Sequence, residues 1–171
     1  MNFLNDVTAP GHTVRITERA LSIMDDGRSA TAETRRFEVL EHTADAGIIA
    51  YGAGLPELFV NAALGLFSLM VDLSGVRETD SREIEAHASD LETLLIRWLT
   101  ELLYHVDAEE MVFSRFEVTA MDETSLRARA YGERIDPERH DLGFGVKAVT
   151  RHMLEIAHQD SGYRATVLFD I

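Results

Sequence analysis

The chain has 171 residues, of which 46% are hydrophobic, and a formal net charge of −14 at pH 7 from 30 acidic and 16 basic residues. This length suffices for one domain with a proper core, while the negative charge repels phosphate backbones and disfavours general nucleic-acid binding. The absence of cysteine excludes disulfides, thiolate zinc sites and cysteine nucleophiles.

The sequence contains no long apolar run, and its N-terminus lacks a basic region followed by an apolar one. We therefore expect a soluble, cytoplasmic protein with no membrane partner and no strong direct contact with nucleic acid. The basic residues are 15 Arg and a single Lys, Lys147. A lysine ammonium is a compact point charge, whereas an arginine guanidinium is a planar group with several fixed donors, so Lys147 is a candidate for a specific role.

The N-terminal part of the chain differs in character from the rest. Residues 1–35 are polar, and we expect a mobile or partly helical extension with one amphipathic patch from Val14 to Met24. Organised structure is expected from Arg36. FEVLEH and AGIIAYG each predict a strand, with the turn HTAD between them. Residues 36–171 are then expected to form a single domain.

Two amphipathic helices are predicted. The first begins at Pro56, whose missing N–H costs nothing at a helix start, and runs to about Asp72. The second follows a capping box formed by Ser89 and Glu92. Its wide apolar stripe indicates a central core helix. The stripe consists of Leu91, Leu94, Leu95, Trp98, Leu99, Leu102, Leu103 and Val106.

Further strands are predicted on both sides of the second helix. REIEAHA alternates and precedes that helix, whereas MVFSRFEVTAM and SLRARAYGE follow it around the turn MDET. After the polar loop ERIDPERHDLG, GVKAVT and HMLEIAH form one or two strands, and QDSG turns into the last strand, YRATVLFDI. This order predicts an α+β domain in which two main helices pack against a largely antiparallel, mixed β-sheet system.

Three acidic groups are candidates for binding a cation: Asp45, Asp170 and the C-terminal carboxylate of Ile171. If the HTAD turn lies beside the end of the last strand, these groups crowd together and repel one another unless a cation or protons lie between them. Oxygen ligands suit Ca²⁺, Mg²⁺ or Mn²⁺. The alternative is that Asp45 accepts hydrogen bonds within its turn and that the terminal carboxylate is solvated.

Other polar residues leave alternatives open. His42, His140 and His152 lack the i, i+4 spacing of helical zinc motifs, so hydrogen-bonded structural histidines are the simpler interpretation. Lys147 and Glu155 share a face if their strand is continuous, either as a solvated ion pair or as a positive point beside an acidic site. The sequence has no G-x-S-x-G, P-loop or G-x-G-x-x-G motif.

Several segments together resemble the archease family: EHTADAGIIAYG, LPELFVNAALGLFSLMVD, EAHASDLETLLIRWLTELLY, MVFSRFEV, ERIDPERHDLGFGVKAVTRHMLEI and the ending FDI. The resemblance covers residues 36–171 in order. It implies an α+β protein that is not itself an enzyme but a metal-binding accessory protein. Such a protein activates a GTP- and Mn²⁺-dependent RtcB-type RNA ligase by promoting guanylylation and multiple turnover in tRNA splicing and RNA repair.

The resemblance also implies the residues of the site. A divalent cation, Ca²⁺ in crystals or else Mn²⁺ or Mg²⁺, is expected at Asp45, Asp170 and Ile171. The functional surface around it is expected to include His42, Lys147, His152 and Glu155.

The family leaves the role of this chain partly open. A second role linked to the family is that of a chaperone or modulator of tRNA-modifying enzymes such as a tRNA cytosine methyltransferase. A metal-dependent hydrolase is a third interpretation, which needs an open coordination position and a general base. The chain departs from the family's pattern at Arg151, where an aromatic residue is common, and in residues 1–35, which the short forms lack.

Overall fold

The computed structural model describes residues 7–9, 12–14, 35–41 and 45–171. Near the N-terminus, β1 (Val7–Ala9) and β2 (His12–Val14) pair antiparallel with each other, a hairpin that the sequence did not predict. Apart from Val14, the amphipathic patch predicted up to Met24 lies outside the described residues, so its helical character stays a prediction.

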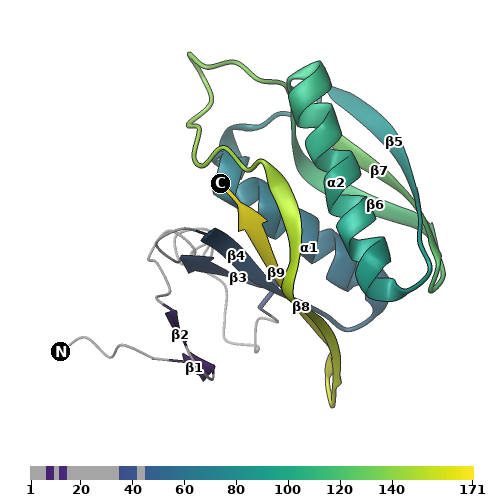
Figure 1. Ribbon diagram of the computed structural model, residues 1–171. Coiled ribbons are helices and arrows are strands. Elements are labelled where there is room, and N and C mark those ends of the chain that lie inside the picture. The colour runs from purple at the N-terminus through teal and green to yellow at the C-terminus, as the bar shows by residue number, and fades with distance from the viewer. Residues whose placement is uncertain (1–6, 10–11, 15–34, 42–44) are drawn as a thin grey trace, which may run out of the picture.

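The described part of the domain contains two antiparallel sheets (Figure 1). The first sheet has the strand order β3-β4-β9-β8, and the second has the order β5-β7-β6. The predicted α+β architecture is confirmed, and every strand pair within the described residues is antiparallel. The strands of the two sheets are β3 (Phe37–Glu41), β4 (Asp45–Gly52), β5 (Asp80–His87), β6 (Met111–Met121), β7 (Ser125–Arg134), β8 (Ala148–Gln159) and β9 (Gly162–Asp170).

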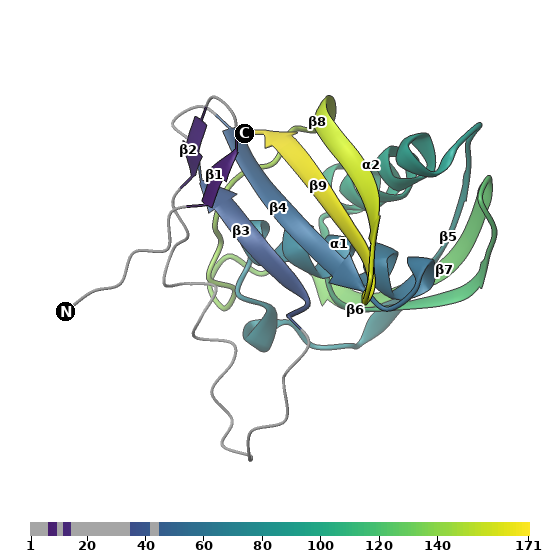
Figure 2. The ribbon, with the colours of Figure 1, turned by 90° about the horizontal axis from the view of Figure 1, so that it is seen from below.

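Two α-helices, α1 (Leu55–Met70) and α2 (Leu91–Glu109), lie behind the first sheet as it is seen in Figure 2. Helix α1 packs on β4 and also contacts β6, whereas α2 packs beside β8 and β5. The helices therefore join the two sheets around one core. None of the helices in the described ranges is long and apolar enough to cross a membrane.

Two close contacts fix the helices in this core. Gly65 lets α1 lie against β4, because a Cβ at this position would be 2.9 Å from the Cδ1 atom of Ile48. Trp98 of α2 is fully buried and donates its indole N–H to the carbonyl oxygen of Phe59 in α1 at 3.0 Å. This bond satisfies the one polar atom of the indole ring and ties the helices together.

The start of α2 corrects the predicted capping box. Asp90, rather than Ser89, is the N-cap residue, and its carboxylate accepts a hydrogen bond from the N–H of Thr93 at 2.8 Å. Glu92 instead accepts a hydrogen bond from the N–H of Ile156 in β8 at 3.4 Å. Asp90 directly precedes the first helical residue, Leu91, so it and not Ser89 is placed to cap the N–H of Thr93. The first turn of α2 thus covers part of the outer edge of β8.

The segment predicted as one or two strands is one strand, β8, with an irregularity in its middle. Thr150 pairs with Leu168, but Glu155 pairs with Thr166, so β8 contains extra residues between the two pairs. Met153 lies in this bulge with a φ of 56°, a conformation that non-glycine residues rarely adopt. The continuous strand that was the condition for Lys147 and Glu155 to share a face is therefore absent.

Candidate functional site

The register of the first sheet places Asp45 directly opposite Asp170. Asp45 is the first residue of β4 and Asp170 is the last residue of β9. Antiparallel pairing of these strands therefore places two residues side by side that are 125 positions apart in the sequence. Figure 2 shows the C-terminus at this point, beside β4. Cβ atoms of directly opposite residues lie about 4.5–5.5 Å apart, so the two carboxylates are near neighbours.

Both aspartate side chains belong to the face of the sheet that is turned away from the helices. Alternate residues of β4 and β9 lie in the buried core, and strand alternation puts Asp45 and Asp170 on the other face. The core residues of these strands are Ala46, Ile48, Ala50, Ala165, Val167 and Phe169. Asp45 is half-buried and Asp170 is exposed, so the carboxylates are accessible to water and to a partner.

Lys147 completes what we call the C-terminal corner, which consists of Asp45, Lys147, Asp170 and Ile171. The backbone N–H of Lys147 donates to the carbonyl oxygen of Asp170 at 2.7 Å. Its Nζ atom donates to the main-chain oxygen of Ile171 at 3.2 Å. Neither aspartate side chain has a hydrogen-bond or ion-pair partner among the described residues. The ammonium therefore contacts the last residue, and no cationic side chain of the described residues pairs with either aspartate.

The chemistry of the corner fits a hard divalent cation, which prefers oxygen ligands and stabilises crowded carboxylates. No three His, Cys, Asp or Glu side chains in the described part of the chain lie close enough together to hold a metal ion. The corner supplies two such side chains, and its third anionic ligand would be the carboxylate of the last residue, Ile171, a main-chain group.

Of the four residues predicted for the surrounding surface, Lys147 lies at the corner. His42 lies outside the described residues. His152 is exposed in the bulge of β8, where its backbone N–H donates to the Oγ1 atom of Thr150 at 3.0 Å. The neighbouring Arg151 donates to the hydroxyl of Thr93 in α2 at 3.2 Å. This contact ties the bulge to the start of α2.

Glu155 does not belong to the corner. It pairs with Thr166, four positions before Asp170 in β9, which corresponds to about 13 Å along the strand. Its carboxylate instead lies 3.9 Å from the guanidinium of Arg164 in the same sheet. The expectation that Glu155 is near the acidic site is therefore corrected, because Ala148 pairs with Asp170 and β8 runs away from the corner from there.

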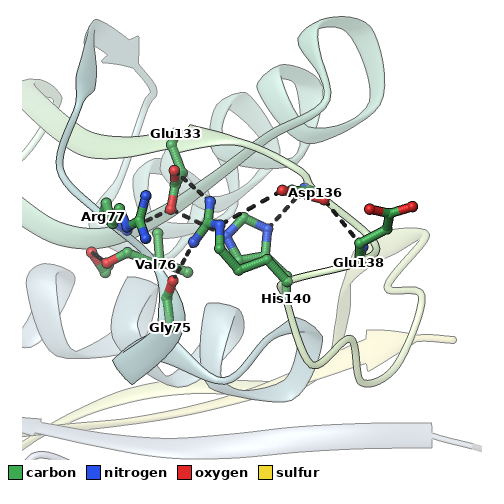
Figure 3. A network of polar contacts seen from close by, with 9 residues as sticks. Gly75, Val76, Arg77, Glu133, Asp136, Glu138 and His140 are labelled. Carbon is green, nitrogen blue, oxygen red and sulfur yellow. Dashed lines mark hydrogen bonds and ion pairs between the residues drawn. The ribbon is translucent and has the colours of Figure 1, made fainter.

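A second polar cluster, which the sequence did not reveal, surrounds the buried carboxylate of Glu133 at the end of β7 (Figure 3). This carboxylate accepts hydrogen bonds from the backbone N–H of Arg77 at 2.7 Å and from His140 Nε2 at 3.2 Å. Arg139 Nη2 lies 2.6 Å away as an ion-pair partner. Burial by itself raises the pKa of Glu133, but the three donors outweigh it and lower the pKa to about 2.

His140 is held through both ring nitrogens. Its Nδ1 atom accepts a hydrogen bond from the backbone N–H of Asp136 at 2.9 Å, so the ring proton is on Nε2 and is donated to Glu133. A neutral, doubly hydrogen-bonded ring has no lone pair left for a metal. The structural interpretation of this histidine is thus the correct one, and the alternative site built from His42, His140 and His152 loses a ligand.

Comparison with known proteins agrees with the fold and with the order of its segments. The model of the Archease protein family (MTH1598/TM1083) matches residues 37–171. The chain is 46% identical over 138 residues to the protein archease of Saccharolobus solfataricus, a match that covers 80% of this chain and 99% of that protein. It is 42% identical over 137 residues to the protein archease of Sulfolobus acidocaldarius, with the same coverage of 80% and 99%.

Two solved structures are similar as well. The solution structure of protein 1598 of Methanobacterium thermoautotrophicum has 42% sequence identity and a TM-score of 0.71, and the match covers 81% of this chain and all (100%) of that one. The crystal structure of an archease from Thermotoga maritima, described as a possible chaperone, has a TM-score of 0.55 and covers 84% of this chain and 100% of that one. Its identity is 17%, so this second likeness concerns the fold alone.

Proposed function

The chain belongs to the archease family, and from this premise we propose that it is a metal-binding accessory protein that activates an RtcB-type RNA ligase. In this role it is not an enzyme itself. It promotes guanylylation of the ligase and repeated turnover in tRNA splicing and RNA repair. The observation that carries the proposal is the pairing of Asp45 with Asp170 beside the last residue of the chain.

The charges of the corner support a divalent cation. Asp45, Asp170 and the carboxylate of Ile171 carry three negative charges, and Lys147 carries one positive charge, so two negative charges remain. When bound, a divalent cation supplies a positive centre that neutralises these charges and orients oxygen ligands around it. Ca²⁺, Mn²⁺ and Mg²⁺ all accept carboxylate and main-chain oxygens.

The charge of the whole chain supports a basic partner. The net charge of −14 complements a ligase face that must itself bind RNA and GTP. Asp170 is exposed at the end of β9 and Lys147 is exposed just before β8, so the corner is accessible to such a face. Activation then follows if the corner binds one conformation of the ligase more tightly than the other, because only differential affinity shifts an equilibrium.

Multiple-turnover RNA ligation by the partner ligase tests the proposal. We expect Asp45→Ala and Asp170→Ala to abolish the stimulation while leaving the proteins folded. Asp160→Ala is the matched control, because Asp160 is an exposed acid in the turn between β8 and β9. Full stimulation by the two folded corner variants would refute the role of the corner. Recovery of a tRNA cytosine methyltransferase instead of the ligase in a pull-down from native cells would favour the chaperone role.

A further inference from the structure

We propose that His140 and Glu133 are positioning residues that fix the segment after β7 and thereby hold Lys147 and the end of β9 in place. The segment in question, residues 135–147, is called the β7–β8 loop below. The proposal rests on the proposed function only where metal affinity is concerned. The positioning of Lys147 and the end of β9 by Glu133 and His140 is argued from contacts of the described residues alone.

The β7–β8 loop is largely exposed and has few apolar anchors. Of its thirteen residues, all of them described, only His140 and Val146 are buried, each 5% exposed. The stretch Asp141–Gly145 between these two anchors is exposed throughout. A segment with so little buried apolar surface depends on specific hydrogen bonds for its order. One of its two anchors is a polar ring, so the partners of that ring decide how firmly the segment is held.

The anchor at His140 connects the loop to the second sheet. Glu133 lies in β7, and its carboxylate accepts a hydrogen bond from the ring of His140 (Figure 3). Arg139 forms an ion pair with the same carboxylate. The Nη1 atom of Arg139 also donates to the carbonyl oxygen of Gly75 at 2.9 Å. The second ring nitrogen accepts from Asp136, which closes the first turn of the loop on itself. The carboxylate at the centre therefore holds two consecutive loop residues at once.

Between His140 and the corner, main-chain hydrogen bonds join the β7–β8 loop to the end of α1. The N–H groups of Gly143 and Phe144 donate to the carbonyl oxygens of Met70 and Leu69 at the end of α1, each at 2.8 Å. The fit is close, because a Cβ at Gly143 would lie 2.3 Å from the oxygen of Leu69. The loop thus supplies donors to carbonyl groups that a helix end leaves without intrahelical partners.

The loop ends on the corner itself. After Val146, the backbone N–H of Lys147 donates to the oxygen of Asp170 at 2.7 Å, and the ammonium of Lys147 donates to Ile171. A loop released at His140 would keep one buried anchor, and the main chain at Lys147 would no longer be held firmly against β9. The end of β9 would then fray, and the proposed ligands would lose their preorganisation.

Hydrogen exchange of the full chain tests this inference. We expect His140→Ala to reduce the protection of the Gly143, Phe144 and Lys147 amides selectively, by about tenfold or more relative to the amides of β4. Ile84→Val is the control, because Ile84 is buried in the second sheet away from the loop and its truncation lowers stability without a local effect. Glu133→Gln is a second variant in case His140→Ala fails to fold, and it should show the same pattern more weakly.

Conservative replacements separate positioning from general stability. His140→Asn keeps an acceptor for the N–H of Asp136, and His140→Gln keeps a donor that reaches towards Glu133, so each should restore part of the protection. Unchanged protection of the three amides in His140→Ala, or a uniform loss across the chain as in Ile84→Val, would overturn the inference.

Titration with Mn²⁺ or Ca²⁺ adds a second readout. We expect His140→Ala to weaken binding through lost preorganisation of the ligands. Unchanged affinity in a folded His140→Ala variant of a protein that binds the ion would contradict the link between the loop and the corner. If the unmodified protein binds neither ion, the metal site of the proposed function fails, while the exchange experiment still decides whether His140 positions the loop.

Discussion

Removing one carboxylate from the corner should raise the stability of the fold when no divalent cation is present and lower it when one is bound. Asp45 and Asp170 are direct cross-strand neighbours and have no partner among the described residues, so they repel each other in the metal-free protein. Asp170→Asn keeps the shape of the side chain and removes its charge. We therefore expect the variant to be more stable than the parent in a chelator and less stable than the parent when a divalent cation is present.

The magnitude follows from the geometry. Two unit charges about 5 Å apart at a water-exposed site repel by roughly 1 kcal/mol, and salt reduces this further. A change of 1 kcal/mol corresponds to about 2–4 °C in Tm for a chain of this size. On the other side, a cation present at about 100 times its Kd stabilises the parent by about 2.7 kcal/mol. The parent should therefore gain more from the cation than the variant gains from lost repulsion.

Thermal unfolding with a chelator and with Ca²⁺ or Mn²⁺ measures both effects in one series. The control is Asp160→Asn, in which an equally exposed acid is neutralised away from the corner. The control should follow the parent in both conditions. An Asp170→Asn variant that is stabilised by the cation as much as the parent, or that is destabilised in the chelator, would refute the reasoning about the corner.

Three further results are expected. A tag added after Ile171 should weaken divalent-ion binding in calorimetry relative to an N-terminal tag, because it converts the terminal carboxylate to an amide; equal affinities would remove that carboxylate from the ligand set. The lowered pKa of Glu133 stabilises the fold above about pH 4.5, and this contribution is lost as the pH falls towards about 2. Glu133→Gln should therefore be less stable than the parent at pH 7, and its stability should change less with pH on acidification; the same pH dependence in both proteins would contradict this. Asp90→Ala should lower the midpoint of urea unfolding clearly and Ser89→Ala much less, since Asp90 is the N-cap; equal losses would restore the predicted capping box.

The sequence predicted most of the strands and both helices, because their apolar periodicity is regular and their ends carry strong signals. It placed the start of α2 at the wrong residue because Ser89 and Asp90 are adjacent candidates, and only the geometry shows which one accepts from Thr93. It also could not predict the bulge in β8, since no local residue pattern marks Thr150 to Glu155. Glu155 lies away from the corner because β8 begins opposite Asp170 at Ala148, seven residues before Glu155.

The candidate site was only partly predictable for a related reason. Spacing along the chain shows that Asp170 and Ile171 are neighbours, but the position of Asp45 depends on which strands pair and in which register. Long-range pairing of this kind has no signature in a single sequence; the family resemblance supplied it, and the register agrees with it. The cluster around Glu133 had no signal at all, because an acid in an alternating strand is ordinarily exposed.

The most direct test of the corner is a crystal of the protein soaked in Mn²⁺. We expect an anomalous difference peak between the carboxylates of Asp45 and Asp170 and the terminal carboxylate of Ile171, with metal–oxygen distances of about 2.0–2.6 Å. A soaked crystal in which these carboxylates are ordered but no peak lies between them, or in which the manganese binds elsewhere, would contradict the account.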